Sequence, residues 1–129
     1  MSYRRVLLLS TLLVSFLLYG TATAAGSPSA FTGAWTATDP DDGSTLKLQI
    51  GAPNASGVSR VTLMDQFASA CGALATAIGR GTVSGVTLSS TLDIRCGGSP
   101  FASDVPATFE VVGDTLVDGN GLVWTRVGG

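Results

Sequence analysis

The chain of 129 residues contains no histidine, only two cysteines and few charged side chains. Without histidine, general acid–base catalysis would depend on carboxylates, and nucleophilic triads of the usual kind are excluded. Two cysteines alone are too few ligands for a metal site built on sulfur and imidazole. We therefore expect a protein that is not an enzyme and that carries no metal or other cofactor.

Basic side chains are also scarce. The full chain has seven of them against nine acidic ones, and loss of Arg4 and Arg5 with an amino-terminal leader would leave five, which are scattered. This distribution offers no basic surface for a nucleic acid. No glycine-rich phosphate loop follows a predicted strand and opens a helix. The sequence therefore excludes nucleic-acid binding and phosphate chemistry of the P-loop type.

Residues 1–24 have the pattern of a secretory signal peptide. The cationic head is followed by an apolar run from Val6 to Tyr19, and Ala22-Thr23-Ala24 fits the small-residue rule for cleavage. An uncleaved membrane anchor is the alternative, but the apolar run is short for a helix that spans a bilayer. We expect cleavage after Ala24 and a secreted or periplasmic protein that is no longer attached to a membrane.

Cys71 and Cys96 both lie in the part of the chain expected to be exported. An even number of cysteines in an exported protein favours a disulfide over free thiols. We predict a bond between these two residues.

The first clear element of the mature chain is a hairpin in which a turn at residues 40–43 joins strands over 33–38 and 44–50. A four-residue loop places Trp35 opposite Leu48, so that both side chains point to the interior. A loop of three residues would place Trp35 among polar side chains instead. We therefore predict the four-residue loop, preceded by a flexible lead-in over residues 25–32 in which Phe31 is the only anchor.

Short apolar stretches separated by turn signals continue to the end of the chain. Further strands are expected near 58–65, 73–83, 86–95, 105–112, 115–118 and 122–127. Apolar residues within 66–79 also recur at helical spacing, but we favour a loop followed by a strand, because that hairpin brings Cys71 close to Cys96. The sequence thus predicts an all-β domain over 33–127, an antiparallel meander of seven to eight strands that forms a small closed or nearly closed barrel.

The lengths of the last two turns decide whether an apolar patch forms on the surface. Two-residue turns at 113–114 and 119–120 would point Leu122 and Trp124 outward beside Val117, and these three residues would form an apolar interaction patch. Alternatively, a single bulge would return Trp124 to the core, or the lead-in with Phe31 would cover the patch. We favour these alternatives, because large exposed apolar patches are uncommon on monomers.

The only carboxylate cluster in the sequence is formed by Asp39, Asp41 and Asp42. The nearby glycine stands at the wrong offset for an EF-hand calcium loop. Aspartate, proline and glycine are the usual residues of a tight turn, so turn formation accounts for the whole cluster.

The two ends of the predicted barrel resemble those of the calycins, a group that includes lipocalins, fatty-acid-binding proteins, avidins and a bacterial family of metalloprotease inhibitors. The resemblance is carried by Gly33-Ala34-Trp35 and by Trp124-Thr125-Arg126. It implies that Trp35 packs across one end of the barrel beneath Arg126. The polar residues with which avidins bind biotin are replaced by Thr36 and Ala37, so biotin binding is not implied.

A second pattern, Cys71 followed by residues 79–83 and 95–98, resembles small exported bacterial domains of unknown activity. This resemblance implies a location and a disulfide. Together with the missing catalytic bases, it favours an exported binding module.

The partner of such a module would be a small apolar ligand or an extracellular protein. The predicted inward side chains could also simply fill a narrow barrel. The alternative function is that of a calycin-type protease inhibitor, which would insert residues 25–32 into the cleft of an enzyme. A cavity of ligand size would favour the first function, and a filled barrel with a projecting amino-terminal arm would favour the second.

Overall fold

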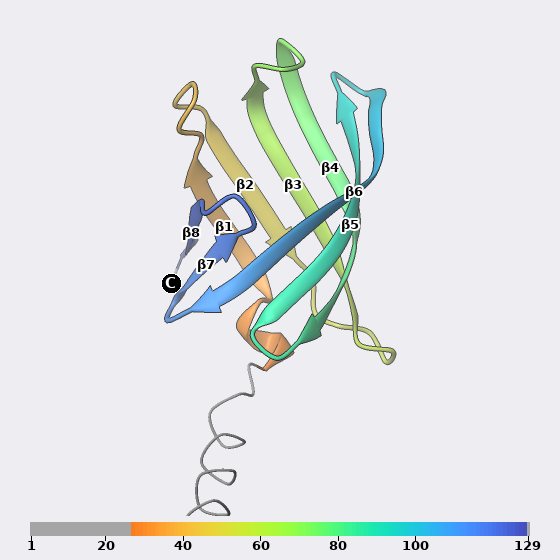
Figure 1. The fold of residues 1–129 in the computed structure, drawn as a ribbon, viewed down its shortest axis with the longest axis vertical. Helices are drawn as coiled ribbons and strands as arrows, with labels where there is room; N and C mark the ends of the chain where they lie inside the picture. The colour runs from red at the N-terminus through yellow and green to blue at the C-terminus, as the bar shows by residue number, and fades with distance from the viewer. Residues whose placement is uncertain (1–26, 129) are drawn as a thin grey trace, which may run out of the picture.

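A computed structural model of the chain describes residues 27–128, in which eight antiparallel strands form a closed barrel (Figure 1). Each strand pairs with the next one in sequence, and β8 returns to pair with β1. The elements are η1 (Pro28–Ala30), β1 (Gly33–Thr38), β2 (Thr45–Ile50), β3 (Val58–Ala68), β4 (Ala73–Ser84), β5 (Thr87–Cys96), β6 (Ser99–Val112), β7 (Thr115–Asp118) and β8 (Val123–Arg126). The predicted all-β meander and its closure are confirmed, whereas the predicted signal peptide at 1–24 lies outside the described residues.

The β1–β2 hairpin has the predicted register. Trp35 lies opposite Leu48, and the Asp39 N–H donates a hydrogen bond to the Ser44 carbonyl across the four-residue loop. Both Trp35 and Leu48 are buried. Loop length and apolar alternation therefore agree on one register, as the sequence predicts.

One end of the barrel, here called the closed end, is covered by the residues that precede β1 (Figure 1). Phe31 is fully buried, and its carbonyl accepts a hydrogen bond of 2.9 Å from the indole N–H of Trp35. Phe31 therefore anchors residues 27–32, as the sequence predicts, and Pro28–Ala30 forms the short helix η1. The buried ring of Phe31 and the hydrogen bond to its backbone carbonyl hold this segment against the barrel.

Arg126 completes the closed end. Its guanidinium carbon lies 4.1 Å from the centre of the Trp35 ring. The same group donates hydrogen bonds to the carbonyls of Thr32 (2.6 Å) and Ala30 (2.9 Å). The structure thus has the packing of Trp35 beneath Arg126 that the calycin resemblance implies.

Residues 66–79 contain the end of β3, a turn and the start of β4, so the favoured reading of a loop followed by a strand is confirmed and the helical one is wrong. The β4–β5 turn differs slightly from expectation. Ser84 lies opposite Thr87, so the turn consists of Gly85 and Val86, and Val86 is exposed rather than inward. The pairing is shifted by two residues, which leaves the inward face of each strand unchanged.

The predicted disulfide between Cys71 and Cys96 is present, with Cα atoms 5.6 Å apart. It joins the β3–β4 turn to the end of β5. Strand β6 begins at Ser99, earlier than the expected 105, and two register shifts opposite β5 accommodate the added length. The disulfide therefore connects two long hairpins at the end of the barrel opposite Arg126.

The β7–β8 loop has three residues, Gly119 to Gly121, instead of the expected two. Gly121 has a φ of 85°, the left-handed value that completes a three-residue hairpin loop. Because of the extra residue, Leu116 lies opposite Trp124, and Val123 points outward.

The outward patch of Val117, Leu122 and Trp124 is consequently wrong. Trp124 is only 1% exposed, and Leu122 packs against the core. The alternative in which Trp124 returns to the interior is the one that the structure has.

Candidate functional site at the barrel mouth

The size of the inward side chains differs between the two ends of the barrel. In the middle the interior is filled by large rings, and Phe109 meets Trp124 edge to face with ring centres 6.3 Å apart. Nearer the end opposite Arg126, several inward positions carry only alanine, namely Ala37, Ala77 and Ala107. A methyl group reaches only a short way toward the barrel axis, so space remains above the rings.

The β1–β2, β3–β4, β5–β6 and β7–β8 loops lie at this end of the barrel, here called the mouth (Figure 1). A cavity of about 600 Å³ at the mouth opens to solvent and has an apolar floor formed by Leu46, Leu63 and Trp124. A smaller hollow of about 380 Å³ adjoins it, since both are lined by Leu63. Small-molecule sites in proteins span roughly 300 to 1,000 Å³, so the mouth has the volume of a ligand site.

Three aspartates stand at the rim of the mouth on the inward side of the sheet. Asp39, Asp65 and Asp118 each lie two residues beyond an inward side chain of the same strand, and residues two apart share a face. All three line the larger cavity together with the exposed Asp41, and no lysine or arginine lines either hollow. The rim is therefore acidic above an apolar floor.

The Asp118 side chain accepts hydrogen bonds from the β7–β8 loop and from Trp124. One of its carboxylate oxygens accepts the N–H groups of Asn120 (2.9 Å) and Leu122 (3.0 Å), and the other accepts the indole N–H of Trp124 at 3.1 Å. This carboxylate therefore stabilises the backbone of the β7–β8 loop and holds the indole ring of Trp124, which forms part of the cavity floor.

Asp39 and Asp65, the other two inward carboxylates, each accept hydrogen bonds from the described residues through one oxygen only. One oxygen of Asp39 accepts the Asp41 N–H at 2.8 Å. One oxygen of Asp65 accepts the Ser44 hydroxyl at 3.0 Å and the Phe67 N–H at 3.1 Å. Among residues 27–128, no hydrogen bond reaches the second oxygen of either side chain, so both retain an acceptor at the rim.

The aspartates of the β1–β2 turn behave mainly as turn residues, as the sequence predicts. Asp42 accepts the Ser44 N–H at 2.8 Å. Hydrogen bonds from the side chain and then the backbone of Ser44 hold the pKa of Asp42 below its ordinary value. Within the described residues, no three cysteine, aspartate or glutamate side chains are grouped so that they could hold a metal ion.

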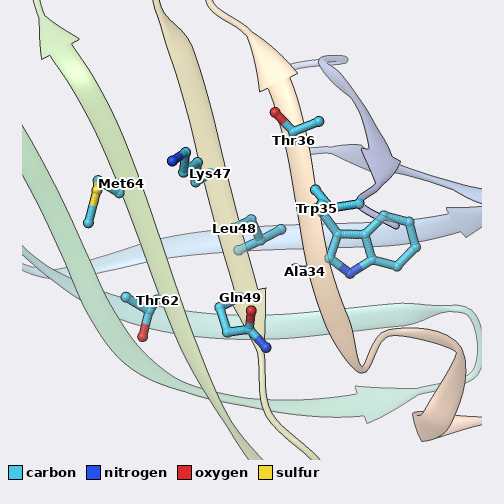
Figure 2. A pocket seen from close by; sticks show the side chains of 9 residues that line it. Ala34, Trp35, Thr36, Lys47, Leu48, Gln49, Thr62 and Met64 are labelled. Atoms are coloured by element: carbon cyan, nitrogen blue, oxygen red, sulfur yellow. The ribbon is translucent and has the colours of Figure 1, made fainter. Parts of the chain in front are cut away.

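A second hollow, of about 580 Å³, lies over the outer face of β1, β2 and β3. Figure 2 shows its side chains, which include Thr36 on β1, Lys47 and Gln49 on β2 and Met64 on β3. Lys47 pairs with both Thr36 and Met64 across the sheet, on the side opposite the buried Trp35. This hollow and the mouth cavity are about equally open to solvent. We take the mouth as the candidate ligand site because carboxylates line it beside apolar side chains of the barrel interior.

Comparisons of the chain with protein-family models, with curated proteins and with solved structures gave no match. The class of protein is therefore defined by the fold, a small antiparallel barrel of eight strands that is compatible with a calycin-like barrel. The disulfide is consistent with an extracellular or otherwise oxidising compartment. Over residues 27–128, no helix has the length and apolar character needed to cross a membrane.

The mouth is not predicted as a site from the sequence, because Asp65 stands at the end of a predicted strand and Asp39 belongs to the aspartates assigned to a turn. Two signals were available, namely alanines at inward positions of β1, β4 and β6 and aspartates two residues beyond inward side chains. Their meaning depends on which strands face one another across the barrel.

Proposed function

We propose that this protein is an exported, non-enzymatic module that binds a small and largely apolar ligand in the mouth of its barrel. The observation that supports the proposal most directly is the cavity of about 600 Å³ above Leu63 and Trp124. The opposite end is closed by Phe31 and Arg126, so a ligand would enter and leave by the mouth alone. We place the protein outside the cytoplasm, secreted or periplasmic, in agreement with its disulfide and the amino-terminal pattern.

The expected affinity is moderate. A ligand that fits this volume has roughly 12 to 20 non-hydrogen atoms, each contributing about 0.3 kcal/mol. The dissociation constant would then lie between roughly 40 μM and 2 mM. A tighter natural ligand would need polar contacts in addition to the apolar floor.

Protease inhibition through the amino-terminal segment is the alternative, and the geometry of residues 27–32 weighs against it. Phe31 is buried, and the carbonyls of Ala30 and Thr32 accept hydrogen bonds from Arg126. Insertion of this segment into an enzyme cleft would first require these contacts to break. Ligand binding at the mouth needs no such rearrangement.

The proposal is tested with N-phenyl-1-naphthylamine, an apolar fluorescent probe that is uncharged at neutral pH. Ala107 lines the smaller hollow and faces the interior, so Ala107→Phe would fill part of the mouth. We expect this variant to bind the probe at least about fivefold more weakly than the wild type, a loss of about 1 kcal/mol. Leu63→Phe, at the point shared by both hollows, is the second variant in case the first does not fold.

Ala55→Phe is the matched control, because Ala55 is exposed in the β2–β3 loop outside both hollows. It should bind the probe as the wild type does. If the wild type does not bind the probe, or if the mouth variants and the control bind it equally, the proposed function is wrong.

A further inference from the structure

We infer that the ligand of the mouth is a small organic cation, an ammonium group carried on an apolar body. This inference rests on the proposed function and adds the charge of the ligand to it. It is carried by the position of the rim carboxylates relative to the apolar floor, and the cavity itself is the evidence for a ligand site.

The charged side chains that line the mouth cavity are all acidic. Asp39, Asp65 and Asp118 occupy inward positions, and no basic side chain lines the cavity. Carboxylates that line one opening attract a cation and repel an anion.

The rim also offers the right hydrogen-bond partners. Asp39 and Asp65 each have one oxygen that accepts no hydrogen bond from the described residues, and ionised carboxylates are acceptors only. An ammonium group has N–H donors and no acceptor, so it is complementary to these oxygens. Asp118 is not part of this proposal, because both of its oxygens are already occupied by Leu122, Asn120 and Trp124.

The apolar floor of the cavity indicates that the rest of the ligand is apolar. Below the carboxylates lie Leu46 and Leu63, with the buried ring of Trp124 beside them. An apolar body that reaches this floor leaves its charged end at the level of the rim, where solvent remains accessible. The arrangement therefore fits an amphiphilic amine of limited length, and a fully polar cation would gain nothing from the floor.

Three probes with the same ring system test the charge directly: 2-naphthylmethylamine, 2-naphthylmethanol and 2-naphthoate, which are cationic, neutral and anionic at neutral pH. We expect the cation to bind roughly three- to tenfold more tightly than the alcohol, since each partly exposed charge pair contributes modestly. We expect the anion to bind most weakly. Raising the salt concentration from about 0.05 M to about 0.5 M should reduce the preference for the cation, because screening weakens exposed charge pairs.

The carboxylates are tested with the double variant Asp39→Asn and Asp65→Asn. It should lose most of the preference for the cation while it still binds 2-naphthylmethanol. Asp114→Asn is the matched control, because Asp114 lies in the exposed β6–β7 turn outside both hollows. It changes the net charge without changing the rim, and it should keep the full preference.

The outcomes separate this inference from the proposed function. If all three probes bind equally, or if the anion binds most tightly, the mouth is a ligand site but the inference about charge is wrong. If none of the three binds, both the inference and the proposed function fail. A preference that Asp114→Asn abolishes as strongly as the double rim variant would also overturn the inference, because the net charge of the protein would then be its cause.

Discussion

Arg126 lies over Trp35, with its guanidinium carbon 4.1 Å from the centre of the indole ring. The two residues are also directly opposite in the β1–β8 pairing, which consists of only two residue pairs. The shortest seam of the barrel is therefore reinforced by a cation–π contact and by the hydrogen bonds from Arg126 to residues 30 and 32.

Replacement of Arg126 should destabilise the protein strongly for a residue at the surface. Arg126→Ala removes the contact with Trp35 and two charge-assisted hydrogen bonds, so we expect a loss of about 2 to 4 kcal/mol in the free energy of unfolding. Urea titration measures it. Arg80→Ala, at an exposed outer position of β4, should cost less than about 0.5 kcal/mol. Equal effects of the two changes would show that Arg126 does not hold the closed end.

Gly33 should be coupled energetically to Arg126. A Cβ at position 33 would lie 2.6 Å from a guanidinium nitrogen of Arg126, and the backbone has a φ of 134°, which disfavours any side chain. We expect Gly33→Ala to cost about 2 kcal/mol in the wild type and less in the Arg126→Ala background. A double-mutant cycle measures the difference. Strictly additive costs would mean that backbone strain alone explains the glycine.

The disulfide should contribute a large share of the stability of this small domain. Cys71 and Cys96 are 25 residues apart, and in the chain-entropy model a loop of this length stabilises the fold by about 3 kcal/mol. The double variant Cys71→Ala and Cys96→Ala should therefore unfold at a clearly lower urea concentration. Reductant should shift the wild type in the same direction and leave the variant unchanged. A wild-type midpoint that does not respond to full reduction would contradict this estimate.

Asp118 should be important for stability, although it stands at the rim of a candidate site. Asp118→Ala removes the acceptor of two backbone N–H groups and of the Trp124 indole, and we expect a loss of about 2 to 3 kcal/mol. Asp114→Ala in the neighbouring turn is the control and should change stability by less than about 0.5 kcal/mol. If both substitutions are neutral, the loop does not depend on Asp118, and the position of Trp124 must have another cause.

The fold could be predicted from the sequence where the local pattern was compatible with only one loop length and one strand register. In the first hairpin, only the four-residue loop placed Trp35 on the same face as Leu48. The glycines around Asn120 allowed loops of two or three residues, and the difference of one residue exchanged Val123 and Trp124 between surface and core. Local sequence did not distinguish these loops, because the choice depends on packing against Phe109 and on the acceptor oxygens of Asp118.

The candidate site was less predictable than the fold, because a cavity is a property of several strands together. Ala107 and Leu63 lie on strands far apart in the sequence, and only barrel closure brings them to one hollow. The amino-terminal segment was predictable only in part. Phe31 could be expected to anchor residues 27–32, but only the closed end shows where its ring packs.

The central claim, that the mouth binds the ligand, is tested most directly by following the indole N–H signals of the two tryptophans by NMR during titration with N-phenyl-1-naphthylamine. Trp124 forms part of the cavity floor, whereas Trp35 is buried beneath Arg126 at the closed end. We predict a saturable shift of the Trp124 signal while the Trp35 signal stays unchanged. A shift of Trp35 alone, or no saturable shift of either signal, would contradict the account.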